Sequence, residues 1–217
     1  MTAGSGLPHE FQYADASHQA NTAIAGMWLF LATEVLLFGG LILCWIYSRH
    51  WNPVGFDAGA RQTALWIGTL NTALLITSSF LYALGVAFMR VGNARALIHC
   101  LVLTLMLALA FLVLKFGLEY RDDFARHLFP TATRFALTGA EAAGGRLFFI
   151  FYFLGTGLHG IHMLVGMGLL VWIIRRARRG EFSPQYYTPV EVVGLYWSFV
   201  DLVWLTLYPL IYLVGRG

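Results

Sequence analysis

The chain alternates between long uncharged apolar stretches and short segments that carry its charges. Residues 62–89, 96–114 and 147–174 contain no Asp, Glu, Lys or Arg, and residues 26–47 and 192–214 contain one acid each. A membrane-spanning helix needs about 20 apolar residues, and the strands of a membrane barrel would be shorter and alternating. The pattern predicts an all-α integral membrane bundle of five transmembrane helices, at about 26–47, 64–89, 97–118, 147–174 and 192–214.

Composition supports this prediction. Of 217 residues, 59% are hydrophobic and 12% charged, whereas soluble domains carry about 25% charged residues. The net charge of +3 lies in short runs between apolar stretches, which suits a membrane surface and not nucleic acid. No Lys or Arg precedes Arg49, so the first apolar stretch is expected to be a permanent span, not a signal peptide. We expect a single membrane domain over residues 1–217, with an N-terminal cytoplasmic tail at 1–23.

The orientation of the chain depends on where its arginines lie. Five spans place the two termini on opposite sides of the membrane. Basic residues near span ends favour the cytoplasm, and four arginines directly follow the fourth span. This cluster predicts a cytoplasmic N-terminus and a periplasmic C-terminus. The cluster consists of Arg175, Arg176, Arg178 and Arg179. It is also expected to contact anionic lipid headgroups; the alternative is that it acts as a topology signal only.

Several polar residues interrupt the predicted spans. Glu34 and Asp201 lie in the first and fifth spans, where an acid at a helix centre costs about 2.5–3.5 kcal/mol. In the predicted topology both lie at the same depth. His159 and His162 share one face of the fourth span because they are three residues apart, and Asn71 lies in the second span. We expect one buried polar layer whose groups bond across helices, with a role in packing alone or in handling protons or bound lipid.

A charged pair marks the end of the third predicted span. Lys115 and Glu119 are four residues apart, the spacing of an ion pair along one helix face. The sequence favours either a pair on the helix surface or a lysine whose ammonium reaches up to the membrane interface.

The histidines do not suggest a resident metal. A six-coordinate haem needs one His on each of two facing helices, but the deep histidines share one helix. A copper centre would need a cluster of His, Cys and Met, and none is evident. No catalytic triad or phosphate-binding loop appears either. We therefore expect no metal site, no cofactor and no catalytic residue in this chain.

Five motifs then occur in a fixed order over about residues 26–214. They resemble subunit III of the haem-copper terminal oxidases (the cytochrome c oxidase subunit III family) in its five-helix bacterial form. The motifs are Met27-Trp-Leu-Phe-Leu-Ala-Thr-Glu34-Val, Leu70-Asn71-Thr72, Lys115-x3-Glu119-Tyr120, Gly155-Thr156-Gly157-x-His159-Gly160-x-His162 and Tyr196-Trp197-x-Phe199-Val200-Asp201.

The resemblance implies a non-catalytic subunit of a hetero-oligomeric respiratory complex in the bacterial inner membrane. Its partners would be oxidase subunits I and II, which hold the haems and copper, reduce dioxygen and pump protons. The family's subunit III stabilises the catalytic subunit and binds structural phospholipids in a cleft. Glu34 matches the family's membrane-embedded carboxylate near that cleft, and His159, His162 and Asp201 match its buried polar positions.

The sequence leaves several alternatives open. The family commonly has His where Ser198 stands, so a proton or lipid role for that position is in doubt. A related subgroup accompanies nitric oxide reductases and shares the five-span core. From other classes, a membrane cytochrome b anchor or a proton-conducting transporter built around Glu34 and Asp201 are the rivals. The electron donor, cytochrome c or quinol, is not specified by these residues.

Overall fold

The computed structural model describes residues 16–133 and 135–216, and within these residues it consists of helices and connecting loops without a β-strand. Five helical segments in this described part of the chain are long and apolar enough to cross a membrane, which confirms the predicted fold class. The elements are α1 (Ala16–Trp51), α2 (Pro53–Gln62), α3 (Leu65–Arg90), α4 (Ala94–Leu112), η1 (Val113–Glu119), α5 (Tyr120–Ala125), η2 (Gly139–Glu141), α6 (Ala142–Arg178), α7 (Thr188–Tyr208) and η3 (Pro209–Leu213).

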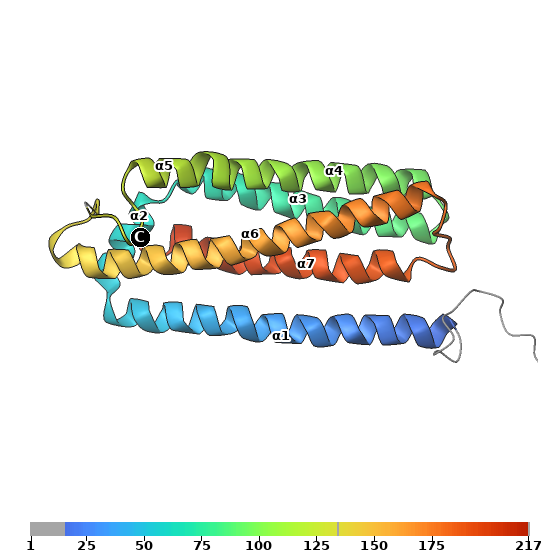
Figure 1. The fold of residues 1–217 in the computed structure, drawn as a ribbon, viewed down its shortest axis with the longest axis horizontal. Coiled ribbons are helices and arrows are strands. Elements are labelled where there is room, and N and C mark those ends of the chain that lie inside the picture. The colour runs from blue at the N-terminus through green and yellow to red at the C-terminus, as the bar shows by residue number, and fades with distance from the viewer. Residues whose placement is uncertain (1–15, 134, 217) are drawn as a thin grey trace, which may run out of the picture.

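The long helices lie side by side along one axis, and α1 lies at the edge of the bundle, where it packs on α6 and α7 (Figure 1). We call the end where α1 begins the N-end; it also holds the α3–α4 turn and the α6–α7 loop. The opposite end, here called the C-end, holds α2, α5 and the last residues of the chain. Successive long helices therefore run in opposite directions, as expected for short connections.

The helices extend beyond the predicted spans. The first spanning segment covers Ser17–Trp51 and the third Ala94–Ala125, compared with the predicted 26–47 and 97–118. Apolar length marks only the part of a helix inside the hydrocarbon, whereas the backbone hydrogen bonds continue into the interfacial region. Because α1 begins at Ala16, residues 16–23 of the predicted tail belong to a helix. The rest of that predicted tail lies outside the described residues.

Helix α2 was not predicted, and two glycines explain how it packs. A Cβ added to Gly55 would lie 2.5 Å from the Cα of Gly144 in α6, so only glycine allows the two backbones to approach this closely. Phe56 of α2 is buried and packs edge-on against Phe148 of α6. Helix α2 is thereby fixed across α6 and closes the C-end of the bundle.

Two π-helical segments, η1 and η3, interrupt the third and fifth spans near the C-end. Segment η3 begins at Pro209, whose missing N–H cannot donate to the preceding turn. Such wide turns change which face the following side chains occupy, and they occur often at functional sites. Here both π-segments turn polar side chains toward the inside of the bundle.

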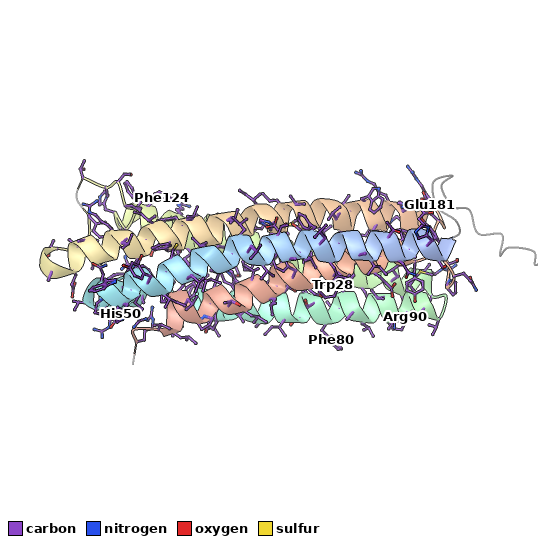
Figure 2. All side chains as sticks on the ribbon, turned by 90° about the horizontal axis from the view of Figure 1, so that it is seen from below. Trp28, His50, Phe80, Arg90, Phe124 and Glu181 are labelled. Atoms are coloured by element: carbon purple, nitrogen blue, oxygen red, sulfur yellow. The ribbon has the colours of Figure 1, made fainter. Side chains whose placement is uncertain are left out.

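The outer surface of the bundle is apolar along most of its length. Trp28 and Phe80 lie on this surface, between Arg90 and Glu181 near one end and His50 and Phe124 near the other (Figure 2). Exposed large apolar side chains occur on every long helix, among them Leu36, Ile76, Met106, Leu164 and Leu202. Such a surface fits a hydrocarbon environment, and the chain is a multi-pass membrane protein.

Candidate functional sites inside the bundle

The ion pair between Lys115 and Glu119 forms, with 3.0 Å between Nζ and Oε2, but it does not lie on the helix surface. Lys115 is 0% exposed and Glu119 1% exposed. Both alternatives favoured by the sequence, a surface pair and a lysine reaching the membrane interface, are therefore wrong. Both residues belong to the π-segment η1, which directs them between α6 and α7, where polar partners replace water.

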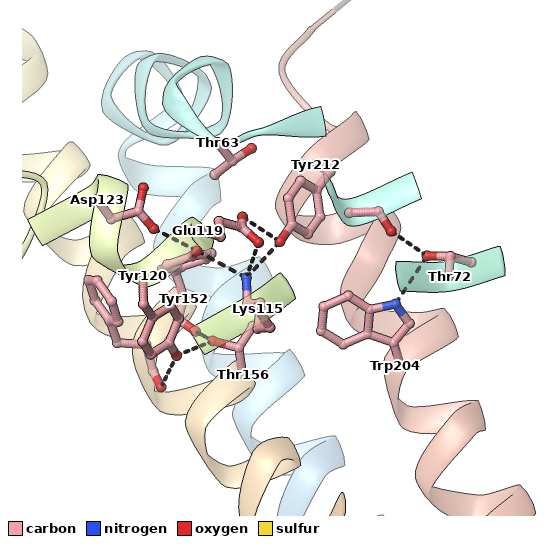
Figure 3. Close-up of polar contacts among 12 residues, drawn as sticks. Thr63, Thr72, Lys115, Glu119, Tyr120, Asp123, Tyr152, Thr156, Trp204 and Tyr212 are labelled. Carbon is pink, nitrogen blue, oxygen red and sulfur yellow. Dashed lines mark hydrogen bonds and ion pairs between the residues drawn. The ribbon is translucent and has the colours of Figure 1, made fainter. Parts of the chain in front are cut away.

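Lys115 is the centre of a closed hydrogen-bond network (Figure 3). Its ammonium donates to Glu119, to the hydroxyl of Tyr152 at 3.0 Å and to the hydroxyl of Tyr212 at 2.6 Å. A lysine ammonium has three donors, so all of them are used. Tyr212 in turn donates to Glu119 Oε1 at 2.6 Å, and Tyr152 donates to Asp123 Oδ2 at 2.7 Å. We call these five residues the Lys115 network.

Several neighbours hold the Lys115 network in place. The Tyr152 ring centroid lies 4.3 Å from Lys115 Nζ, and this close approach of cation and ring is attractive. Thr156 donates to the backbone oxygen of Tyr152 at 2.6 Å. A Cβ added to Gly68 of α3 would lie 2.8 Å from the Tyr212 ring, so glycine at this position makes room for that ring. The network thus joins α5, α6, η1 and η3 at the C-end.

Three members of the network were not predicted. Asp123 follows Glu119 by four residues, and this spacing on the same helix face was a usable signal. Tyr152 and Tyr212 lie within apolar stretches distant in sequence from Lys115. Tyrosines are common at the ends of spans, so nothing local distinguished these two.

A second site joins α1 to α6. Glu34 Oε2 lies 3.0 Å from His162 Nε2, and both side chains are 14% exposed. The other ring nitrogen, Nδ1, lies 2.9 Å from the backbone oxygen of Leu158. Tyr196 of α7 donates to the backbone oxygen of His162 at 3.0 Å, and Phe38 packs edge-on against the imidazole. Two of the predicted site residues are therefore brought together.

The hydrogen bonds of His162 determine where its protons lie. The Leu158 oxygen can only accept, so Nδ1 carries a hydrogen. Nε2 then either accepts a hydrogen from a protonated Glu34 or, as part of an imidazolium, donates one to the carboxylate. In both arrangements one hydrogen lies between the two side chains and the pair has no net charge. This neutrality reduces the cost of placing Glu34 inside a span.

Asp201 belongs to a different seam, between α7 and α3. Its Oδ2 accepts a hydrogen bond from Ser79, while Oδ1 has no partner among the described residues. In the same seam, the indole of Trp204 donates to Thr72 Oγ1 at 3.0 Å and that of Trp197 to Ser78 Oγ at 3.2 Å. Asp201 thus faces α3 and not Glu34.

Asn71 and His159 are buried without a side-chain hydrogen bond in the described part of the chain. The imidazole of His159 packs against Phe111 and Trp204, with ring centroids 5.4 Å and 5.2 Å away. The single polar layer expected from the sequence is therefore not formed. Depth along the helix was a poor guide, because the direction in which each side chain points decides its partner.

The four arginines that follow the fourth span have different environments at the N-end. Arg176 is ion-paired with Glu181, and its guanidinium lies over Trp172 and Phe182, 4.9 Å and 5.2 Å from the ring centroids. The guanidinium of Arg179 lies 3.8 Å from Glu181. The remaining two, Arg175 and Arg178, are exposed. Three of the four thus remain accessible to solvent or headgroups.

Two grooves flank α1 at the N-end. One, of about 500 Å³, lies between α1, α6 and α7, with Met27, Leu169 and Trp172 among its lining residues. The other, of about 530 Å³, lies between α1, α3 and α7 and contains Ser198. An ion pair between Arg90 and Glu191, 3.0 Å apart, stands at its mouth. The first groove lies about two helical turns from Glu34 and His162 along α1 and α6.

No group of three or more His, Cys, Asp or Glu side chains in the described residues has an arrangement that could hold a metal ion.

Comparison with known proteins places the chain in a family. The model of the cytochrome c oxidase subunit III family matches residues 11–216. Cytochrome c oxidase subunit 3 of Thermostichus vulcanus is 29% identical over 198 residues, 89% of this chain and 88% of the relative. Quinol oxidase subunit 3 of Bacillus spizizenii is 26% identical over 213 residues, 98% of this chain and 95% of the relative.

A third relative is larger. It is the haem-copper oxidase subunit I+III of Aeropyrum pernix, 27% identical over 197 residues, which are 88% of this chain and 22% of the relative. The match of the family model over nearly the whole chain agrees with the five spans and with the resemblance read from the motifs. The chain belongs to the cytochrome c oxidase subunit III family and is a subunit III of the haem-copper oxidase type.

Proposed function

We propose that this chain is a non-catalytic subunit that packs against subunit I of a haem-copper oxidase and keeps phospholipid bound beside it. The haems and copper would belong to partner subunits I and II, which carry out dioxygen reduction and proton pumping. The observation that carries the proposal is the combination, in one chain of this family, of a hydrogen-bonded Glu34–His162 pair and an apolar groove two turns away.

The partner is proposed from a relative. The Aeropyrum pernix protein is named as subunit I+III, so in that protein the two parts belong to one polypeptide. A separate subunit III would then form the same contact between chains. Relatives include both a cytochrome c oxidase and a quinol oxidase subunit, and the proposal holds for either electron donor.

The lipid site is proposed from the groove between α1, α6 and α7. Its lining includes Met27, Leu169 and Trp172, which suit an acyl chain, and the exposed guanidinium groups of Arg175 and Arg178 lie at the same end of the bundle. Basic residues near the surface attract anionic headgroups. The same arginines favour a cytoplasmic N-end, and hence a periplasmic C-end in a bacterial inner membrane.

The surroundings of the deep histidines support assigning the metals to partners. Both ring nitrogens of His162 are engaged, with Glu34 and Leu158. The ring of His159 is enclosed by Phe111 and Trp204. Neither His159 nor His162 lines one of the two grooves, and a haem ligated by His159 would have to displace Phe111 of α4 and Trp204 of α7.

Purification of the assembled complex tests this proposal. The chain carries an affinity tag and is solubilised in mild detergent, and the bound proteins and lipids are identified by mass spectrometry. We expect a haem-containing subunit I to be recovered with the tagged chain, together with phospholipid. The proposal would be contradicted if the tagged chain were recovered alone, and if an oxidase that lacks this chain kept its full activity and its lifetime during turnover.

A further inference from the structure

We propose that the C-end of the bundle carries a second lipid site, for an anionic phospholipid whose phosphate lies between Arg61 and Arg126. Its acyl chain would follow the first turns of α3. This site is at the opposite end of the bundle from the groove considered above and does not depend on docking to subunit I.

The site is a broad groove of about 880 Å³ between the α2–α3 turn and the end of α5. Arg61, from the last turn of α2, and Arg126, directly after α5, both line it. Arg126 donates to the backbone oxygen of Gln62 at 3.2 Å and to its side-chain oxygen. This contact holds the Arg126 side chain next to the residue that follows Arg61, so two cationic groups face one groove.

The two guanidinium groups keep donors free for a ligand. Arg61 uses its Nε to donate to the backbone oxygen of Gly215 at 3.1 Å, which leaves both of its terminal amino groups. The carboxylate of Asp122 lies 3.5 Å from the guanidinium of Arg126, and the Asp122 side chain is 61% exposed. A guanidinium has five donors in a planar fork that matches phosphate oxygens. Two like charges at one groove are stabilised by an anion between them.

Much of the remaining lining of the groove comes from apolar side chains of α3. Leu65, Leu70 and Ala73 of α3 line it, and Trp66 of α3 is 63% exposed. Thr69, the polar residue among them, is already bonded to the hydroxyl of Tyr208 at 2.8 Å, so the floor demands no further hydrogen bond. Tryptophan is typical of the membrane–water boundary. An anionic headgroup joined to a hydrocarbon tail matches both parts of this groove.

These features favour a phospholipid over a free phosphate ion. A free ion would use the two arginines but leave the α3 face uncovered. A helix of a partner protein would cover that face but would bring no anion to the arginines. The anionic phospholipid satisfies both parts, and its headgroup would lie at the level of the α2–α3 turn.

Lipid retention measured by native mass spectrometry tests the site. The purified complex is exchanged into nanodiscs containing phosphatidylglycerol or phosphatidylcholine and then extracted stepwise with detergent. We expect wild type to retain one phosphatidylglycerol more than the variant carrying Arg61→Gln and Arg126→Gln. The affinity of wild type for this lipid should be about 25-fold higher, since each of the two basic residues near an anionic headgroup contributes about fivefold. Arg121→Gln, which removes an exposed arginine of α5 outside the groove, is the matched control and should retain the lipid.

A further variant separates the two halves of the site. Ala73→Trp fills the apolar half without changing charge and should also release the lipid, whereas inorganic phosphate at millimolar concentration should not displace it from wild type. The proposal is overturned if phosphatidylcholine is retained equally, if inorganic phosphate displaces the lipid, or if the double variant retains as much phosphatidylglycerol as wild type. Circular dichroism of each variant shows that the helices persist.

Discussion

Two polar regions of this bundle accommodate polar side chains inside an apolar protein in different ways. In the Lys115 network every donor of the ammonium is used, two tyrosines relay hydrogen bonds to two carboxylates, and Lys115, Glu119 and Asp123 are at most 2% exposed. In the Glu34–His162 pair a single hydrogen bond connects two side chains, each 14% exposed. This pair lies where α1 packs on the rest of the bundle. The network is closed, and the pair remains accessible.

This difference separates polar groups that only hold the structure together from polar groups that can affect binding. A charged group whose hydrogen-bonding positions are all occupied by protein partners can only hold helices together. A partly exposed pair near a groove can instead affect which lipid binds beside it. The Lys115 network joins elements that are distant in the sequence, so we expect it to dominate stability. The Glu34–His162 pair should instead affect what binds beside the chain.

The largest effect is expected for Lys115→Met. It leaves Glu119 and Asp123 buried without their cation, and breaking a buried pair from one side costs about 3–5 kcal/mol. Denaturant unfolding of the purified protein in detergent micelles measures the free energy of unfolding. The exposed Arg121 lies on the neighbouring helix α5, and Arg121→Gln should change this free energy by less than about 0.5 kcal/mol. Equal stability of Lys115→Met and wild type would show that the network is not closed.

A smaller loss is expected for Gly68→Ala. The added methyl group would lie 2.8 Å from the Tyr212 ring and would push that ring away from Lys115, a strain that costs about 1–3 kcal/mol. The matched control is Gly39→Ala in α1, where an added Cβ has no neighbour within 4 Å. There, alanine should be neutral or stabilising by up to about 1 kcal/mol, because it favours the helix. The same unfolding assay compares both, and equal losses would mean that Tyr212 is not held by close packing.

Glu34→Ala should cost less stability than Gly68→Ala, about 1 kcal/mol, since it removes one partly exposed hydrogen bond. Its larger consequence should be for bound lipid, which we expect to fall in the purified complex while the partner's haem spectrum stays unchanged. Glu34→Gln should behave as wild type in stability, because the amide can donate to His162 Nε2 as a protonated carboxyl does. A lost haem spectrum in Glu34→Ala would contradict the remote role of this pair.

The smallest effect is expected for His159→Phe. Both ring nitrogens of His159 lack a hydrogen-bond partner among the described residues, and its ring packs on Phe111 and Trp204. Replacing an unpaired buried polar ring by an apolar ring of similar size should change the free energy of unfolding by no more than about 1 kcal/mol, and can stabilise. A loss of more than about 3 kcal/mol would reveal a polar partner for this imidazole.

The five spans could be predicted because desolvation requires uncharged apolar stretches of a minimum length, and that requirement is local. The helix ends could not, because helices α1 and α6 continue past the hydrocarbon into segments with polar residues. Helix α2 was not predicted because only ten residues form it and because a glycine contact with α6 determines its position.

For the candidate sites, the depth of each polar residue in its span could be predicted from the sequence, but the direction of its side chain could not. Glu34 and Asp201 were predicted at one level, yet Glu34 meets His162 of α6 and Asp201 meets Ser79 of α3. The spacing of Lys115 and Glu119 predicted their ion pair correctly, but the wide turn of η1 that buries them has no simple sequence signal. Tyr152 and Tyr212 reach Lys115 only through the packing of α6 and η3.

The central proposal is that this chain's polar groups hold helices and lipid while the electron-carrying centres belong to its partners. The most direct test is the visible absorption spectrum of the tagged chain, expressed and purified without other subunits and supplied with haem, beside the spectrum of the assembled complex. The account predicts a haem Soret band in the complex and none in the isolated chain. A Soret band that stays with the isolated chain and disappears with His159→Phe or His162→Gln would contradict it.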